Sequence, residues 1–206
     1  MAHYKEIVVV IVSYMLGCVS TGYYLTKFLA GKDIRNLGSR STGATNVGRI
    51  LGKRGFLITL SGDFLKGMVA MSIAVVLQLE PWAVQASLLS VVIGHIWPVQ
   101  LSFCGGKGVA AAFGALLIFD YFLAVGCLAV FVMFFFLLRK YIVSGLLGIF
   151  ALPLLAVLLR EPLVDITGLT ILVFLILFAH RANILRSIQS SSISTEPKNR
   201  QKGEIK

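Results

Sequence analysis

The chain has 206 residues, of which 57% are hydrophobic and only 14% are charged. Because soluble domains average about a quarter charged residues, this composition excludes an ordinary soluble domain and predicts an all-α polytopic membrane protein embedded in a lipid bilayer. The net charge of +10 would suggest nucleic acid as the partner of a soluble protein. In a membrane protein it fits the basic residues that cytoplasmic loops collect, so no nucleic acid is expected, and an anionic ligand is the second interpretation.

Apolar stretches long enough for membrane helices, which need about 20 residues each, follow one another along the chain. The stretch 108–138 is too long for one helix, and Asp120 with Tyr121 divides it into a short fourth span and a fifth. A short or Gly-interrupted span is tolerated where neighbouring helices cover its backbone. Seven transmembrane helices are therefore predicted, at about 6–29, 55–79, 82–99, the two parts of 108–138, 142–159 and 163–180.

Basic and non-basic junctions alternate between these spans. The loop 30–54 carries six basic residues and one acid, the next junction carries only Glu80, and the alternation continues to the basic C-terminal segment. Because basic residues concentrate in cytoplasmic loops, the N-terminus is predicted outside and the C-terminus in the cytoplasm. Residues 1–187 are expected to form a single transmembrane catalytic domain, and residues 188–206 a polar, disordered cytoplasmic tail.

The three cysteines are Cys18, Cys104 and Cys127. Their odd number and their spacing fit neither a disulfide framework nor a metal site. All three lie in apolar surroundings, so we interpret them as small core residues and predict no metal site.

Unusual polar motifs gather at one predicted membrane face. They are "DIRNLGSRSTGATNVGR" at 33–49, "GHIWP" at 94–98, "GGKG" at 105–108 and "HRANILR" at 180–186. All lie in predicted cytoplasmic loops or at the cytoplasmic ends of spans. Re-entrant or surface loops are therefore expected to form a site on the cytoplasmic face.

The GGKG segment favours an anionic ligand. Glycines lack a Cβ and let backbone N–H groups approach phosphate oxygens, and the following helix adds its positive N-terminal end. Lys107 supplies a point charge. The segment is not a P-loop, which requires Ser or Thr after the lysine, because Gly108 follows it. The alternative is a plain turn whose lysine only sets the membrane topology.

Three ionisable residues lie inside or near the predicted spans. His95 lies close to a proline on an apolar helix and is either a packed, hydrogen-bonded side chain or part of the site. Asp63 and Lys66 lie three residues apart on one helix and form either an internal ion pair or a functional site, the default interpretation of intramembrane charges. The sequence leaves both questions open.

Taken together, these residues resemble the acyl-phosphate:glycerol-3-phosphate acyltransferases, small enzymes of the bacterial inner (cytoplasmic) membrane that begin phospholipid synthesis. The resemblance covers about residues 13–186. It implies transfer of an acyl group from acyl phosphate to the 1-hydroxyl of sn-glycerol 3-phosphate, which yields lysophosphatidic acid and phosphate. We expect a monomer without a cofactor, with its site facing the cytoplasm. The motifs that carry the resemblance are "DIRNLGSRSTGATNVGR", "DFLKG" at 63–67, "GHIWPVQLSFCGGKGVAA" at 94–111 and "HRANI" at 180–184.

The resemblance also implies site residues. Those expected to act in catalysis are Lys107, Arg49, Ser39 and Asn183. The predicted substrate-binding set comprises Ser39, Thr45, Asn46, Arg49, His95, Gly105, Gly106, Lys107, Gly108, Ser144, His180 and Asn183. Neither histidine is expected to be the base, because the family lacks a His-and-acid motif and relies on substrate phosphate for proton transfer.

Two single residues and the tail depart from the family pattern. Thr21 stands where the family usually has Pro, Ser41 stands where it usually has Asn, and the segment after residue 186 lacks an expected glycine and acidic residue. These departures leave open a catalytically inactive paralogue that binds lipid precursors. A membrane transporter of an organic phosphate is a further alternative, although the polar residues cluster on one face and form no path across the membrane.

Overall fold

The computed structural model describes residues 3–193, with the side chains from 185 onward and that of Asn183 excepted. Within this part of the chain all regular structure is helical, as predicted. The α-helices are α1 (Tyr4–Cys18), α2 (Thr21–Ala30), α3 (Ala44–Val76), α4 (Pro81–Ile96), α5 (Val109–Phe119), α6 (Tyr121–Leu138), α7 (Tyr141–Phe150), α8 (Leu152–Leu159) and α9 (Leu163–Ile193), and the 3₁₀ turns are η1 (Ile34–Asn36) and η2 (Val99–Leu101).

Six segments of the described chain are long and apolar enough to cross a membrane. They are Tyr4–Ala30, Ala44–Val76, Pro81–Leu101, Tyr121–Leu138, Tyr141–Leu159 and Leu163–Ala182. This confirms the prediction of a multi-pass helical membrane protein. The predicted fourth span, α5, has only 11 residues, which at 1.5 Å per residue gives about 16 Å against a hydrocarbon core of about 30 Å.

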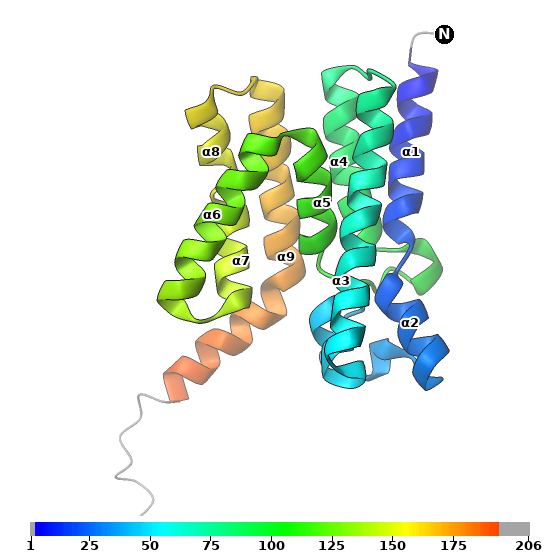
Figure 1. Ribbon diagram of the computed structural model, residues 1–206, viewed down its shortest axis with the longest axis vertical. Helices are drawn as coiled ribbons and strands as arrows, with labels where there is room; N and C mark the ends of the chain where they lie inside the picture. The colour runs from blue at the N-terminus through cyan, green and yellow to red at the C-terminus, as the bar shows by residue number, and fades with distance from the viewer. Residues whose placement is uncertain (1–2, 194–206) are drawn as a thin grey trace, which may run out of the picture.

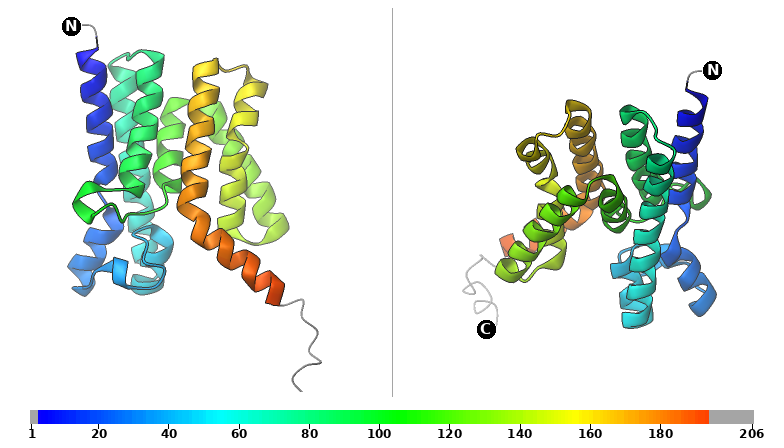
Figure 2. Two further views of the ribbon diagram at one scale, coloured as in Figure 1. Left: turned by 180° about the vertical axis from the view of Figure 1, so that it is seen from behind. Right: turned by 45° about the horizontal axis from the view of Figure 1, so that its top comes forward.

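The helices form two groups with α5 between them (Figures 1 and 2). Helices α1, α3 and α4 lie on one side of α5, and α6, α7, α8 and α9 lie on the other; α4 also contacts α9. Membrane helices pack closely where small residues let their backbones approach. A Cβ atom on Gly94 would lie 2.2 Å from the Tyr14 carbonyl oxygen, and one on Gly114 would lie 2.0 Å from that of Phe64. Glycines thus fix α4 against α1 and α5 against α3.

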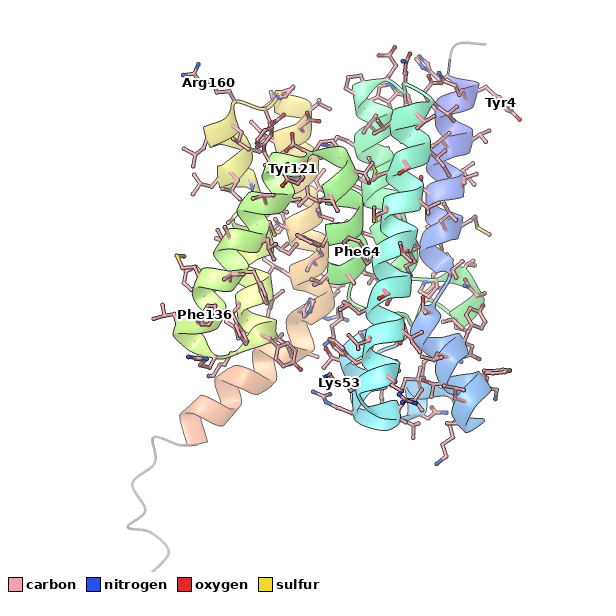
Figure 3. All side chains as sticks on the ribbon, viewed as in Figure 1. Tyr4, Lys53, Phe64, Tyr121, Phe136 and Arg160 are labelled. Atoms are coloured by element: carbon pink, nitrogen blue, oxygen red, sulfur yellow. The ribbon has the colours of Figure 1, made fainter. Side chains whose placement is uncertain are left out.

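The connecting segments differ between the two ends of the bundle (Figures 1 and 3). One end, called here the loop end, carries the long loops 31–43 and 97–108 and the turn 139–140. The other end, the turn end, carries the short connections 77–80 and 160–162 and the α5–α6 junction. Lys53 lies at the loop end and Tyr4 at the turn end, where the described chain begins (Figure 3).

The predicted division at Asp120 is confirmed. Helix α5 ends at Phe119 and α6 begins at Tyr121. The backbone of Asp120 is extended, and its Oδ1 atom accepts a hydrogen bond of 2.7 Å from the N–H of Leu123. Asp120 is therefore the N-cap that starts α6, since a capping carboxylate satisfies an otherwise unpaired N–H.

Other predicted boundaries differ from the structure. The stretch 6–29 is two helices, broken at Val19 and Ser20, and the stretch 142–159 is broken at Ala151, two residues before Pro153. Helix α3 begins at Ala44, inside the predicted loop 30–54, and includes a non-helical Gly52 with φ of 71°. Each break falls where glycine, proline or an extended residue interrupts the helical hydrogen-bond ladder.

The predicted tail begins at residue 188, but α9 continues to Ile193. The rest of that tail, residues 194–206, lies outside the described residues.

Candidate active site

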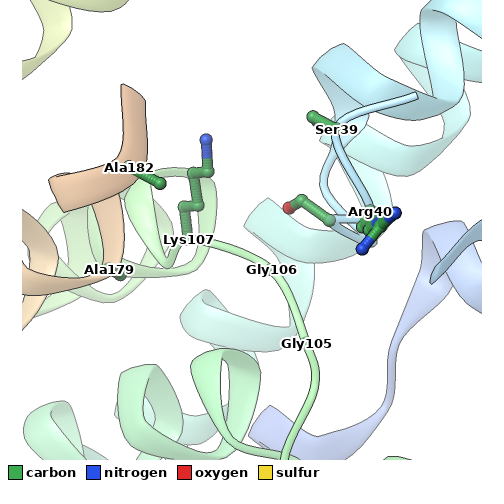
Figure 4. A pocket seen from close by; sticks show the side chains of 8 residues that line it. Ser39, Arg40, Gly105, Gly106, Lys107, Ala179 and Ala182 are labelled. Atoms are coloured by element: carbon green, nitrogen blue, oxygen red, sulfur yellow. The ribbon is translucent and has the colours of Figure 1, made fainter. Parts of the chain in front are cut away.

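A pocket of about 180 Å³ opens at the loop end (Figure 4). Three segments that are distant in sequence surround it. They are the loop 31–43 before α3, called here the first loop, the segment 105–108 before α5, called the glycine segment, and residues 179–182 of α9. Its lining residues are Ser39, Arg40, Ser41, Gly105, Gly106, Lys107, Ala179 and Ala182. The sequence predicted that these loops would meet on one face, and in this pocket they do.

The first wall is a loop that Asn46 holds in shape. The Asn46 side chain is buried in the first turns of α3. Its Oδ1 atom accepts a hydrogen bond of 2.9 Å from the N–H of Ser39, and its Nδ2 atom donates to the carbonyl oxygens of Leu37 and Ser41, each at 2.9 Å. All its polar atoms therefore serve the loop, so the structure gives Asn46 a supporting position beneath Ser39 and Ser41.

The second wall is the glycine segment, which lies flat against the end of α4. The N–H of Gly105 donates to the carbonyl of Ile96 at 3.1 Å, and the N–H of Gly106 donates to the carbonyl of His95 at 3.0 Å. The carbonyl of Gly105 accepts a hydrogen bond of 3.2 Å from the N–H of Thr42. This segment therefore joins α4 to the first loop.

These bonds correct one part of the sequence interpretation. The N–H groups of Gly105 and Gly106 were expected to face phosphate, but both are engaged by α4. The glycines are needed because α4 is so close: a Cβ atom on Gly105 would lie 2.3 Å from the His95 carbonyl oxygen, and one on Gly106 would lie 2.0 Å from the Nε2 atom of the same residue.

The pocket is electropositive. Lys107 and Arg40 are the charged members of its lining, and no acid belongs to that set. The Lys107 side chain extends into the space between α9 and the loop that holds Ser39 (Figure 4). Hydroxyl groups of Ser39 and Ser41 stand on the opposite wall. Two cations and two hydroxyl groups in a lining without an acid favour a phosphate or another anion.

A charged pair braces the loops from outside the pocket. The guanidinium of Arg35 pairs with Asp33 at 2.6 Å and donates from Nη1 to the carbonyl of Leu101 at 2.8 Å. It thereby connects the first loop to η2. Hydrogen bonding from Arg35 lowers the pKa of Asp33 below its usual value, so this carboxylate stays charged at neutral pH.

Several predicted site residues lie outside the lining. Thr45 and Arg49 lie on the first turns of α3, where Arg49 is exposed, and Gly108 is the N-cap of α5 with φ of 86°. Ser144 is buried in α7, and its hydroxyl donates to the Lys140 carbonyl at 3.0 Å. None of these four belongs to the lining of the pocket.

His95 on α4 and His180 on α9 are also absent from the lining of the pocket. His95 is buried behind Gly106 and does not line the pocket. His180 is buried on α9, with Nδ1 2.8 Å from the Ile176 carbonyl oxygen. Asn183 follows the lining residue Ala182, and its side chain lies outside the described part of the structure.

The predicted site set leaves out four lining residues. Arg40 and Ser41 belong to a motif already singled out, so their presence could have been inferred from the neighbouring Ser39. Ala179 and Ala182 carry no chemical signal, because alanine on an apolar helix is ordinary. Of the two single-residue departures, Ser41 lines the pocket and Thr21 begins α2, where the usual proline would also suit a first helical position.

Within the described residues 3–193, no group of three or more His, Cys, Asp and Glu side chains is arranged to hold a metal ion.

Comparison with known proteins agrees with this architecture. The chain matches the glycerol-3-phosphate acyltransferase family over residues 7–190. It is 43% identical over 187 residues to glycerol-3-phosphate acyltransferase 1 of Desulfitobacterium hafniense, covering 91% of this chain and 93% of the relative. It is 35% identical to glycerol-3-phosphate acyltransferase 1 of Bacillus cereus, covering 88% of this chain and all of the relative.

Two crystal structures of PlsY (YgiH), an integral membrane glycerol 3-phosphate acyltransferase, have a similar fold. The glycerol 3-phosphate form superposes with a TM-score of 0.83 at 32% identity, and the lysophosphatidic acid form with 0.81 at 29% identity. Each match covers 90% of this chain and 92% of the other. Because the family match spans nearly the whole described chain and agrees with the six-span helical fold, this protein belongs to the glycerol-3-phosphate acyltransferase family.

Proposed function

We propose that the protein transfers a fatty acyl group from acyl phosphate to the 1-hydroxyl of sn-glycerol 3-phosphate. The observation that carries this proposal is the electropositive pocket, in which Lys107 lies across from the loop that carries Ser39, Arg40 and Ser41. Both substrates carry phosphate, and the related PlsY structures hold glycerol 3-phosphate and lysophosphatidic acid. The reaction would supply lysophosphatidic acid as the first step of phospholipid synthesis.

The proposed reaction needs little chemistry from the protein. The 1-hydroxyl oxygen attacks the acyl carbonyl carbon, the bond from that carbon to the bridging phosphate oxygen breaks, and the departing phosphate takes up the hydroxyl proton. An acyl phosphate is already activated, so positioning and charge neutralisation can supply much of the acceleration. Lys107 and Ser39 are proposed to hold phosphate oxygens directly.

Arg49 and Asn183 are the other two residues proposed to act in catalysis. Arg49 is exposed at the loop end, where its long side chain is free to approach a bound anion. Asn183 follows Ala182 on α9, at the side of the pocket opposite the first loop. Thr45, Ser144 and His180 are retained as proposed substrate contacts that would form when both substrates are bound.

We further propose seven membrane crossings, with α5 as the short one. The start of α1 and the end of α9 lie at opposite ends of the bundle (Figure 1), which suits an odd number of crossings. Basic residues dominate the loop end, so by the positive-inside rule this end faces the cytoplasm and the N-terminus lies outside. The membrane would be the bacterial inner membrane, since the relatives named above are bacterial proteins.

We also propose that residues 1–187 act as one catalytic domain and as a monomer. The pocket draws its lining from positions 39 to 182 of a single chain, which supports both statements.

Turnover by the purified protein tests the proposal. Palmitoyl phosphate and radiolabelled glycerol 3-phosphate should yield lysophosphatidic acid with the wild type and none with Lys107→Ala. Binding of glycerol 3-phosphate without product would indicate the inactive paralogue. Uptake of glycerol 3-phosphate into proteoliposomes without acylation would indicate the transporter.

A further inference from the structure

Three ionisable side chains are buried together just behind the pocket. The Oδ1 atom of Asp63 on α3 lies 3.1 Å from Nζ of Lys66 and 3.6 Å from Nδ1 of His95 on α4. All three residues are at most 7% exposed. Buried ion pairs are weak contributors to stability because desolvation offsets their attraction, and charges within membrane helices are functional candidates by default. This cluster therefore requires an explanation beyond stability.

The cluster is anchored at the break between α1 and α2. Lys66 Nζ donates to the carbonyl oxygen of Val19 at 2.7 Å, and the Gln100 side chain donates to that of Cys18. Both carbonyls lie at the end of α1, where the helix breaks before α2. Since unpaired backbone groups are costly inside a bilayer, Lys66 fixes this break against α3.

His95 carries the cluster to the glycine segment. Its Nδ1 atom faces Asp63, and its Nε2 atom is so close to Gly106 that a Cβ atom on that glycine would lie only 2.0 Å from it. Its backbone carbonyl accepts the N–H of Gly106. The next residue along the chain is Lys107, which lines the pocket.

We propose that Asp63, Lys66 and His95 position the glycine segment, and through it place Lys107 in the pocket. None of the three lines the pocket, so they are positioning residues rather than catalytic ones. The imidazole is buried between the Asp63 carboxylate, 3.6 Å from its Nδ1 atom, and Gly106, which packs against its Nε2 edge. The cluster thus contains an internal ion pair, between Asp63 and Lys66, and also supports the site.

The first experiment measures local order without activity. Hydrogen–deuterium exchange of the peptide containing residues 104–107 should be faster in His95→Ala and Asp63→Asn than in the wild type, while exchange in α6 stays unchanged. The matched control is Gln85→Met, which removes the buried hydrogen bond of 2.8 Å from Gln85 to Asp165 elsewhere on α4. Unchanged exchange at 104–107 in the two cluster variants, or an equal increase in Gln85→Met, would overturn the proposal.

A paired substitution tests the contact itself. Gly106→Ala should collide with the imidazole and raise exchange at 104–107, whereas the double variant Gly106→Ala/His95→Ala places the new methyl in the space the ring vacated. Exchange in the double variant should return toward the wild-type rate. If exchange at 104–107 in the double variant instead rises by the combined amount of the two single variants, the ring does not support Gly106.

A kinetic cycle then separates positioning from direct catalysis; it rests on the proposed function. His95→Ala should lower kcat on the order of 100-fold, the penalty of misplacing a catalytic group by about 1 Å, with KM for glycerol 3-phosphate changed much less. In a Lys107→Gln background, which should keep a measurable residual rate, the same substitution should add no further loss, because it acts through Lys107. If the kcat losses of the two single variants multiply in the double variant, His95 contributes to catalysis independently of Lys107. If the wild type has no activity, the proposed function fails, but the exchange measurements still decide whether the cluster positions the segment.

Discussion

The two ends of this bundle differ in the length of the segments that connect their helices (Figure 1). At the turn end the helices are joined by the short segments 77–80 and 160–162, which leave little room for a site. At the loop end two long loops meet and are joined to each other by the hydrogen bond from Thr42 to Gly105. The comparison shows that the electropositive pocket opens at the end of the helical bundle where two long polar loops are hydrogen-bonded to each other.

Charge removal at each end should have very different effects. Lys107→Gln at the loop end should lower acyl transfer on the order of 100-fold or more, as expected when a preorganised charge facing phosphate is removed. Arg160→Gln removes the same charge at the turn end, where the side chain is exposed, and should leave turnover unchanged. Initial rates of both purified variants decide this, and equal losses would contradict the account.

Adding a methyl group should distinguish a close contact from open space. Gly105→Ala should lower turnover by roughly 100-fold, because the new Cβ cannot fit beside the His95 carbonyl and the segment must move. Gly145→Ala on α7 meets no atom within 4 Å and should raise stability slightly, since glycine in a helix costs roughly 0.5–1 kcal/mol relative to alanine. Thermal unfolding and initial rates measure both; a fully active Gly105→Ala would show that the segment adapts.

Removing the support of the first loop should have a moderate effect. Asn46→Ala deletes three hydrogen bonds to Leu37, Ser39 and Ser41, each of which stabilises the loop by about 1 kcal/mol. Turnover should fall about tenfold, because the loop that positions Ser39 loosens while every lining side chain remains. Asn36→Ala alters an exposed asparagine of the same loop and serves as the control. Similar rates for the two variants would mean that the loop keeps its shape without the Asn46 carboxamide.

The smallest expected effect is the pH dependence of the Asp33–Arg35 pair. Arg35 lowers the pKa of Asp33, so the pair stabilises the fold above the usual aspartate pKa of about 3.9. That contribution is lost as pH falls through the lowered pKa. Asp33→Asn should therefore have a slightly lower Tm than the wild type at pH 7, and the difference should shrink steadily as the pH falls below about 3.9 toward the lowered pKa. A difference that stays constant over this acid range would assign the effect to something other than the carboxylate.

Much of the fold could be predicted because membrane spans and charge alternation leave strong patterns. The division at Asp120 was visible as one acid in a long apolar stretch. The break at Val19 and Ser20 was not visible, because its cause is tertiary. The side chains of Lys66 and Gln100 donate hydrogen bonds to the carbonyl oxygens that the break leaves unpaired. Short-range sequence patterns carry no record of partners that are 47 and 82 residues away.

The candidate site was predicted in part for the same reason. Lys107 and Ser39 could be found because charge and hydroxyl groups stand out in apolar sequence. The glycines were correctly singled out but given the wrong physical role, since glycine signals close approach without saying to what. Here the close neighbour is α4, and only the structure identifies it.

The most direct test of the central claim is a structure of this protein with glycerol 3-phosphate bound. We expect the phosphate to lie at the loop end, in contact with Lys107 and Ser39, while Gly105 and Gly106 stay hydrogen-bonded to α4. A phosphate bound away from this pocket, or one that displaces the glycine segment from α4 to reach its N–H groups, would contradict the proposed role of the pocket.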